Sequence, residues 1–341
     1  MDDSSNEPSR RRRLKQRDLV MSICSLFSEE YDRSRTESIW DVRIPIERIK
    51  EYLQERHQTE YRSSLWVYTQ LKRYEDELGV RLFRKEQNGK DGGDFSLRIF
   101  HPFVNFSQKQ HLHVSDKIKI ANGAYDKIRH FADERKNGKP LRLLLGAGSS
   151  VFHLAAIIAE RSRTDNIHYL IHTHNLGALQ QLIRTRVNPR HIQLFIPQGI
   201  IDPVTYTILG PQTPLFESST FDFIVQGTSR VCDGRLYIES ADELPRKRAI
   251  LHECTGQKIL LLTKHEFADA PFPGIDSYGS IEDYDFIVVP RRRSDSTERK
   301  SYEALYDRLA ASLAPEIISW NYEILKVRHE GSVQASARGG S

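Results

Sequence analysis

Residues 141–162 read LRLLLGAGSSVFHLAAIIAERS, an apolar run, a glycine- and serine-rich turn and a segment long enough for a helix. Five apolar residues that end at a glycine predict a buried strand, and the turn then leads into a helix. Similar apolar runs occupy 141–145, 167–171, 192–196, 221–225, 258–262 and 286–290, with helices predicted to begin near Ser150, Leu176, Glu243 and Glu303. This alternation is typical of a mostly parallel sheet that helices cover on both faces.

Polar residues follow the predicted strands. Ligands bind beyond the carboxyl ends of strands in such sheets, so these residues are expected to converge on one site. In the GAGSS loop, glycines allow close backbone approach, and the helix start offers unpaired N–H groups and hydroxyls to an anion. A tight turn without a ligand is the alternative. The candidate ligand-binding residues are Gly146, Gly148, Ser149, Ser150, Thr173, His174, Asn175, Gly199, Gly227, Thr228, Glu243, Lys247, Thr263 and Lys264.

The charged candidates have simpler interpretations from the residues alone. Glu243 and Lys247 are four residues apart in the predicted helix ELPRKRAIL, the spacing of an ordinary surface ion pair. Lys264, which follows the run KILLLT, can equally be a solvated lysine.

Residues 14–104 carry a different pattern. Leu19, Ile23 and Phe27 form one face of a first helix, and Pro45 stands at the start of a second helix with Ile46, Ile49 and Leu53 on one face. In a third helix the apolar seam is Val67, Leu71, Tyr74 and Leu78. Ser63 or Ser64 can cap the start of this helix, and Gly79 ends it.

Two predicted strands, VRLFRKE (80–86) and DFSLRIFH (94–101), flank the turn QNGKDGG, whose Asn-Gly and Gly-Gly pairs favour a hairpin. Three helices and a hairpin are the order of a winged helix-turn-helix, in which the third helix enters the major groove and the hairpin contacts phosphates. The candidate DNA-binding residues are Arg62, Ser64, Thr69, Lys72, Arg73, Arg84, Lys85 and Lys90. Protein contacts are the alternative, because Glu75, Asp76 and Glu77 make the far end of the helix acidic.

Composition sets further limits. The 341 residues suit two domains, 38% hydrophobic content supplies cores, and 28% charged residues without a long apolar run predict no membrane span. The acidic and then arginine-rich start predicts no secretory signal, so a cytoplasmic protein is expected. Cys24, Cys232 and Cys254 are few and widely spaced, which predicts reduced, buried thiols, no metal and no cofactor. A net charge of +4 is too mild to indicate nucleic acid by itself.

The resulting domain prediction has five parts. Residues 1–13 form a disordered basic arm that could follow DNA phosphates or simply aid solubility, and 14–104 form the winged helix. Residues 105–140 form a linker and bridging helix, 141–330 the α/β sensing domain, and 331–341 a disordered tail.

In motif order, residues 115–290 resemble the effector-binding domain of the DeoR family of bacterial sugar-phosphate-responsive regulators. The family's strand and D-x-G-T-T loop resembles LRLLLGAGSS, and its T-N-S-L resembles Thr173-His174-Asn175-Leu176. Gln198-Gly199 corresponds to its Gly-Gly turn, and its "FIGADG…GGLT…E-x-x-x-K-R" block resembles FIVQGTSRVCDGRLYIESADELPRKRAI. The later "LLADSSKF" resembles LLLTKHEF, which places Thr263 and Lys264 at matching positions.

The resemblance implies a ribose-5-phosphate isomerase or CoA-transferase type of fold and a phosphorylated metabolite or nucleotide as effector. Gly146, His174 and Glu266 stand where the family has aspartate, asparagine and lysine. The expected function is a transcriptional regulator that binds operator DNA as a homodimer or homotetramer and is not an enzyme, and repression is the expected mode of control. One alternative is an isomerase or CoA-transferase with Glu243 or Lys247 as the acid-base group, and another is a protein-binding scaffold with a vestigial pocket.

Overall fold

The chain divides into two compact units. The computed structural model describes residues 14–34, 39–59, 61, 63–87, 95–100, 105–135, 138–184, 191–210, 220–291 and 312–328. Unit 1 comprises Met1–Phe103 and His111–Val114, and unit 2 comprises Val104–Gln110 and Ser115–Ser341. The predicted arm, the predicted tail and the helix predicted near Glu303 lie outside the described residues.

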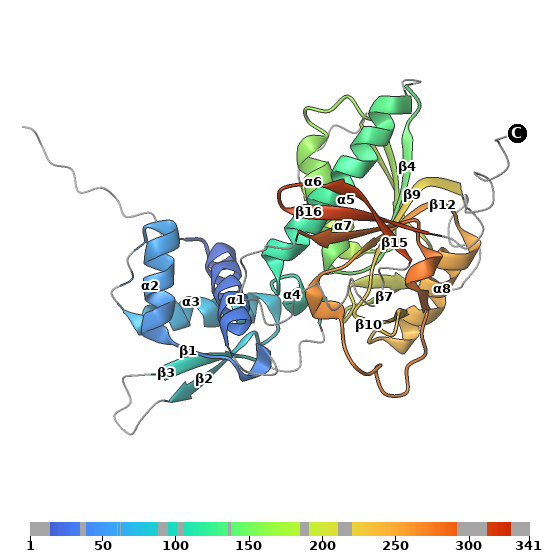
Figure 1. The fold of residues 1–341 in the computed structure, drawn as a ribbon. Helices are drawn as coiled ribbons and strands as arrows, with labels where there is room; N and C mark the ends of the chain where they lie inside the picture. Colours follow the sequence, from blue (N-terminus) through green and yellow to red (C-terminus); the bar gives the residue numbers. More distant parts are fainter. Residues whose placement is uncertain are drawn as a thin grey trace, which may run out of the picture. The chain divides into compact units, whose positions relative to one another are not determined.

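Unit 1 has the element order helix, strand, helix, helix, strand, strand (Figure 1). Its elements are α1 (Gln16–Arg33), a 3-10 turn (Ile39–Asp41), β1 (Arg43–Pro45), α2 (Ile46–His57), α3 (Ser64–Leu78), β2 (Phe83–Gln87) and β3 (Phe95–Ile99). The strands form an antiparallel sheet in the order β1-β3-β2. The helices and the hairpin were predicted, whereas β1 was not, because three residues are too few to produce a period-two pattern.

The helices of unit 1 pack through the predicted apolar seams. Leu19, Ile23 and Phe27 of α1 are almost fully buried, and they belong to the same core as Leu53 and Val67. Ser63 caps α3 by accepting a hydrogen bond from the backbone N–H of Trp66, and Gly79 ends the helix with a φ of 66°. Both ends of α3 are therefore set by the residues that the sequence indicated.

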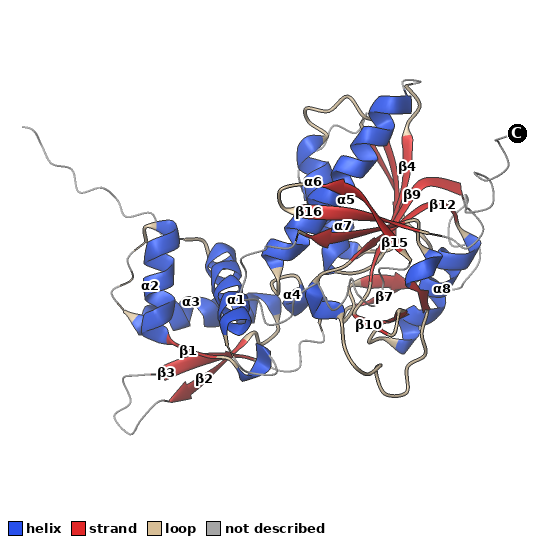
Figure 2. Cartoon of the chain, in the orientation of Figure 1, coloured by secondary structure: helices blue, strands red, loops and turns tan. Residues whose placement is uncertain are grey.

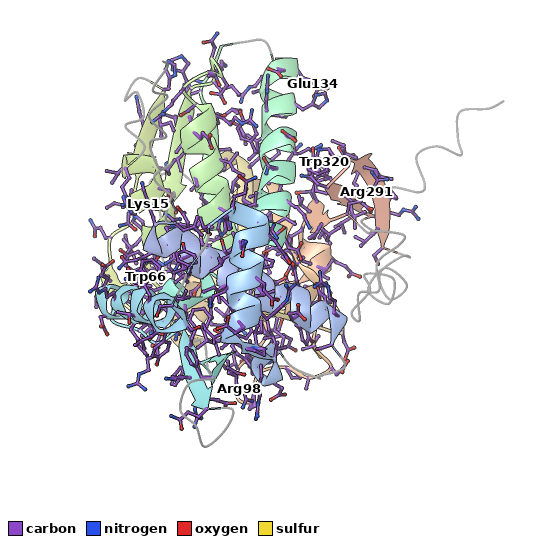
Figure 3. The ribbon with its side chains drawn as sticks, turned by 90° about the vertical axis from the view of Figure 1, so that its left-hand side faces the viewer. Lys15, Trp66, Arg98, Glu134, Arg291 and Trp320 are labelled. Atoms are coloured by element: carbon purple, nitrogen blue, oxygen red, sulfur yellow. The ribbon has the colours of Figure 1, made fainter. Side chains whose placement is uncertain are left out.

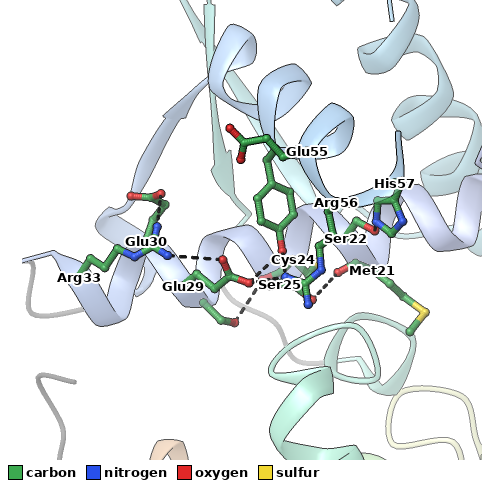
Figure 4. A network of polar contacts seen from close by, with 12 residues as sticks. Met21, Ser22, Cys24, Ser25, Glu29, Glu30, Arg33, Glu55, Arg56 and His57 are labelled. Atoms are coloured by element: carbon green, nitrogen blue, oxygen red, sulfur yellow. Dashed lines mark hydrogen bonds and ion pairs between the residues drawn. The ribbon is translucent and has the colours of Figure 1, made fainter. Parts of the chain in front are cut away.

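A polar network also joins α1 to α2 (Figure 4). Glu29 accepts hydrogen bonds from the Tyr52 hydroxyl at 2.9 Å and from Arg56 Nη1 at 2.7 Å. Burial, together with the neighbouring Glu29 carboxylate, raises the pKa of Tyr52 to about 12. Ser22 Oγ and His57 Nε2 lie 2.8 Å apart. Directional bonds thus add to apolar packing in the two helices that support α3.

The described part of unit 2 is an α/β unit built on a mostly parallel sheet (Figure 2). Eight strands lie in the order β15-β16-β14-β12-β9-β4-β5-β6. They are β4 (Leu141–Leu145), β5 (Tyr169–Thr173), β6 (Ile192–Phe195), β9 (Thr220–Gly227), β12 (Thr255–Leu261), β14 (Phe286–Pro290), β15 (Leu313–Ile318) and β16 (Tyr322–Val327). Neighbours from β6 to β14 are parallel, and β16 is antiparallel to β14.

Six of these strands are the predicted ones. β15 and β16 were missed because Pro315 and several charged residues interrupt their apolar pattern, which an edge hairpin tolerates. The turn between them carries Trp320, which is 83% exposed (Figure 3). Shorter strands complete the unit: β7 (Ile200–Asp202), β8 (Thr207–Leu209), β10 (Arg230–Cys232), β11 (Arg235–Tyr237) and β13 (Gly279–Ser280).

Helices cover both faces of the sheet, as predicted. They are α4 (Phe106–Lys109), α5 (Val114–Arg135), α6 (Ser149–Arg161), α7 (Leu176–Arg184) and α8 (Leu244–Glu253). Because side chains alternate along a strand, Leu143 and Leu145 pack in the core with α5, α6 and α7, whereas Leu144 packs with Ile250 of α8. The loops that leave β4 and β9 therefore lead to helices on opposite faces.

The segment 105–140, predicted as a linker and bridging helix, contributes α4 and α5. Ile120 and Ile128 of α5 are fully buried in the sheet core of unit 2. A Cβ on Gly123 would lie 2.6 Å from Val288 Cγ1 of β14, so α5 approaches the sheet closely. α5 is thus an integral part of unit 2, because its apolar face is buried against the sheet.

The three cysteines are free and buried, as predicted. Among the described residues, no helix combines the length and apolar character needed to cross a membrane. The same residues contain no group of three or more histidine, cysteine, aspartate or glutamate side chains placed to hold a metal.

Candidate functional site

The order of the parallel strands reverses between β4 and β9. β5 and β6 follow β4 on one side, and β9, β12 and β14 lie on the other. At such a point two adjacent connections run to opposite faces, which leaves room for a ligand outside the carboxyl ends of the strands. The backbone N–H of Gly146, directly after β4, donates to Val225 O of β9 at 2.9 Å. The loops that follow β4 and β9 therefore begin side by side.

The glycine-serine loop and the end of β9 lie against one another. Gly148 is the N-cap of α6, with a φ of 113° and no side-chain cap. Ser149 and Ser150 form the first turn, and a Cβ on Gly227 would lie 3.9 Å from Ser150 Cβ. A Cβ on Gly148 would meet none of the described residues within 4 Å, so there is space at the amino end of α6, the end of a helix that favours an anion.

Two predicted ligand residues on the next loop instead organise the backbone. Thr173 Oγ1 donates to Leu145 O at 2.7 Å and accepts the backbone N–H of Asn175. Asn175, which is 1% exposed, donates through Nδ2 to Gly146 O and Gly148 O at 3.1 and 3.0 Å. The buried amide of Asn175 therefore holds the glycine-serine loop in place.

α8 brings Glu243 and Lys247 to the same place. Both are buried, so the interpretation as a surface ion pair is wrong. Lys247 Nζ donates to Gly227 O at 2.6 Å, which places the ammonium group directly beneath the end of β9. Burial lowers the pKa of Lys247 and raises the pKa of Glu243, and each group partly offsets the shift of the other. The helix supplies a buried cation where a strand-end ligand would lie.

His174 and Arg246 complete this cluster. Both are buried, and Arg246 and Lys247 add to the burial that lowers the pKa of His174. Arg246 was missed from the sequence, although Glu243, Arg246 and Lys247 share one face of a helix. A helical wheel of α8 could have included it. Its burial could not be foreseen, because an arginine in PRKR is usually assigned to solvent.

The remaining predicted ligand residues are placed as follows. Thr228 donates to Tyr237 O at 2.8 Å. Gly199 is exposed and approaches Gly210, on which a Cβ would lie 2.8 Å from Gly199 Cα. Thr263 donates through Oγ1 to Glu266 Oε2 at 2.7 Å, and the buried Lys264 follows it. The structure thus brings Gly146, Ser150, Gly227 and Lys247 together, whereas the hydroxyls of Thr228 and Thr263 bind their own loops.

Glu266 gives a prediction for pH dependence. Its burial raises the pKa of its carboxyl to about 7, above the usual value of 4.5. A raised folded-state pKa favours folding below pH 4.5, and this contribution is lost as pH rises through 7. We expect Glu266→Gln to remove a decline of about 2 kcal/mol in the free energy of unfolding between pH 5 and 8. Urea unfolding followed by circular dichroism measures it, and parallel pH profiles of the two proteins would contradict it.

Unit 1 holds the predicted DNA-binding residues, of which Arg62 and Lys90 lie outside the described residues. Ser64 donates to Glu47 Oε1 at 2.6 Å, and Thr69 donates to Leu65 O. Lys72 pairs with Glu75 at 2.5 Å, and Lys85 lies over the Phe95 ring at 4.4 Å. Arg73 on α3 and Arg84 on β2 are exposed. These two arginines are the predicted residues best placed to meet an external partner.

Comparison with known proteins finds no matching family model and no matching curated protein. Solved structures that the comparison matches to this chain include ribose 5-phosphate isomerase A from Methanocaldococcus jannaschii, at 12% identity and a TM-score of 0.31, covering 62% of this chain and 78% of that one. Ribose 5-phosphate isomerase from Plasmodium falciparum has 12% identity and a TM-score of 0.30, covering 63% and 78%. eIF2B beta from Chaetomium thermophilum has 10% identity and a TM-score of 0.34, covering 86% and 84%.

Proposed function

We propose that this protein is a DNA-binding transcriptional regulator whose activity a small phosphorylated effector controls. The observation that carries the proposal is the arrangement of unit 1, with three helices and a three-stranded antiparallel sheet that ends in the hairpin β2–β3. This order corresponds to a winged helix-turn-helix, with α3 as the helix that enters the major groove. Arg73 on α3 and Arg84 on the hairpin then supply the contacts to DNA.

The effector site is assigned to the carboxyl ends of β4 and β9. The helix start at Ser149 and Ser150 and the buried Lys247 offer N–H groups, hydroxyls and a positive charge to a phosphate. The motifs that resemble the DeoR family meet here, since Asn175 orders the loop and Lys247 lies beneath Gly227. A homodimer or homotetramer would present two winged helices to two half-sites, and effector binding would change their spacing.

Charge reversal on α3 tests the DNA-binding role. Full-length protein is used to select duplexes from a random-sequence pool, and the affinity of the selected duplex is measured at several salt concentrations. We expect Arg73→Glu to weaken specific binding by about 10- to 100-fold and to reduce the salt dependence, because one contact to base or phosphate is lost.

Arg129→Glu, on α5 of unit 2, is the matched control. It changes the net charge by the same amount at a residue whose side chain is 53% exposed, and binding should be retained. Failure to enrich any duplex from the pool, or equal loss in both variants, would count against the proposed function.

A further inference from the structure

We infer that Arg246 is an anion-binding residue, and that the effector carries a second acidic group besides its phosphate. The inference rests on the effector-binding role proposed above for unit 2, and it narrows the ligand to small molecules with two separated oxyanions. These are a phosphorylated sugar acid or a sugar bisphosphate, and in both the second group offers paired oxygens to a guanidinium.

The guanidinium of Arg246 is buried and lacks hydrogen-bond partners among the described residues. Arg246 is 3% exposed, and its Nε, Nη1 and Nη2 atoms have no hydrogen-bond partner among the described residues. An arginine stays charged in proteins, and an unpaired buried charge is strongly unfavourable. Burial lowers the pKa of Arg246. Because the described residues supply no partner, we assign that role to an anionic group of the ligand.

The residues near Arg246 include His174 and Lys247. Burial and the charges of Arg246 and Lys247 together lower the pKa of His174, whose two ring nitrogens also lack partners among the described residues. Glu243 is the N-cap of α8, and its carboxylate partly offsets the lowering of the Lys247 pKa. The cluster itself holds two cationic side chains, Arg246 and Lys247, and one carboxylate, Glu243, which also interacts electrostatically with Lys109 and Asp202.

Two glycines lie near the point where a ligand would approach Arg246. Arg246 Nη2 lies 3.4 Å from the position that a Cβ would take on Gly210, and Gly210 packs closely against Gly199. Both glycines are exposed, so among the described residues the guanidinium lies close to a point where the chain itself carries no side chain. A glycine leaves room for the close approach of a planar oxyanion at such a point.

Gly227 and Lys247 lie at the position proposed for the phosphate. Gly227 contacts both partners, because its carbonyl accepts from Lys247 Nζ and its Cα side faces Ser150. Lys247 is thus bonded to the strand end that lies against the amino end of α6, and Arg246 is the residue before it in α8. One small molecule with an anionic group at each end fits this order of donors.

The test compares three probes, a sugar monophosphate, a phosphorylated sugar acid and a sugar bisphosphate, by calorimetric titration of the full chain. We expect the two doubly acidic probes to bind more tightly than the monophosphate. Arg246→Met should weaken the doubly acidic probes by about 30-fold or more and leave the monophosphate nearly unchanged. Arg246→Lys should bind the doubly acidic probes more tightly than Arg246→Met but less tightly than the unmodified protein, because lysine keeps the positive charge and lacks the paired N–H donors of the guanidinium.

Arg248→Met is the matched control, because Arg248 lies on the same helix, is 44% exposed and pairs with Asp276. Its affinities should match the unmodified protein. A second measurement separates ligand binding from a structural role: ligand-free Arg246→Met should unfold at the same or a higher temperature, since it removes an unpaired buried charge.

A lower unfolding temperature for ligand-free Arg246→Met would assign Arg246 to the structure and overturn the inference. Equal binding of all three probes, unaffected by Arg246→Met, would overturn the inference and leave the proposed effector site intact. Absence of binding by every probe would overturn both.

Discussion

Glu75→Ala is expected to unfold much of unit 1. Glu75 is 3% exposed, and its Oε1 accepts the backbone N–H groups of Leu82 and Phe83, each at 2.8 Å. Removing the carboxylate leaves two buried donors without partners at about 1 to 3 kcal/mol each, so we expect a total loss of about 3 to 5 kcal/mol. That loss is comparable to the whole stability of a small domain.

Urea unfolding followed by tryptophan fluorescence measures this change, because Trp40 and Trp66 lie in unit 1 and Trp320 is exposed. Glu75→Gln is the control. Its amide oxygen still accepts both N–H groups, and it loses the pair with Lys72, whose side chain is 35% exposed. It should cost about 1 kcal/mol or less. Equal losses in the two variants would show that charge, and not the acceptor, is what β2 requires.

Glu75 also shows what a residue pattern leaves undetermined in unit 1. Helix seams follow from the spacing of apolar residues, so the positions of Leu19, Val67 and Leu71 in the core could be predicted. Glu75 looks like one acid of an exposed trio, yet it turns inward because the chain after Gly79 returns beneath the helix. The consequence for the candidate DNA-binding set is that Lys72 has an internal partner.

In unit 2 the sequence indicated the region of the candidate site, but it could not indicate which side chains point towards that region. Parallel strands end at one edge of the sheet, so a polar residue after each run could be assigned to a common region. Which side chain faces a ligand depends on tertiary contacts, and Thr173 and Asn175 bond to the backbone of β4 and its loop instead. Arg246 could be identified as a candidate ligand-binding residue only from its burial in the structure, because its place in the charged segment PRKR indicates solvent exposure.

Asn175→Ala is expected to destabilise unit 2 and to abolish effector binding. Its Nδ2 bonds to Gly146 O and Gly148 O, and its Oδ1 accepts the N–H of Ala178 at the start of α7. Two buried backbone groups and one partly buried group lose their partner, so we expect a loss of about 3 to 5 kcal/mol in the free energy of unfolding. Scanning calorimetry measures it. Asn122→Ala is the control, because Asn122 makes one exposed bond within α5 and should cost about 0.5 kcal/mol or less.

Asn175→Asp separates the two sides of this residue. Aspartate keeps an oxygen for Ala178 N–H, but an ionised second oxygen would face the carbonyl oxygens of Gly146 and Gly148. The folded protein therefore favours the protonated form, which raises the folded-state pKa above the usual value of about 3.9. Stability is then highest at low pH and falls as pH rises through the folded-state value. We expect Asn175→Asp to be more stable than Asn175→Ala near pH 5 and to lose that advantage by pH 8. A constant difference between the two variants would mean that the glycine-serine loop does not depend on the donor of Asn175.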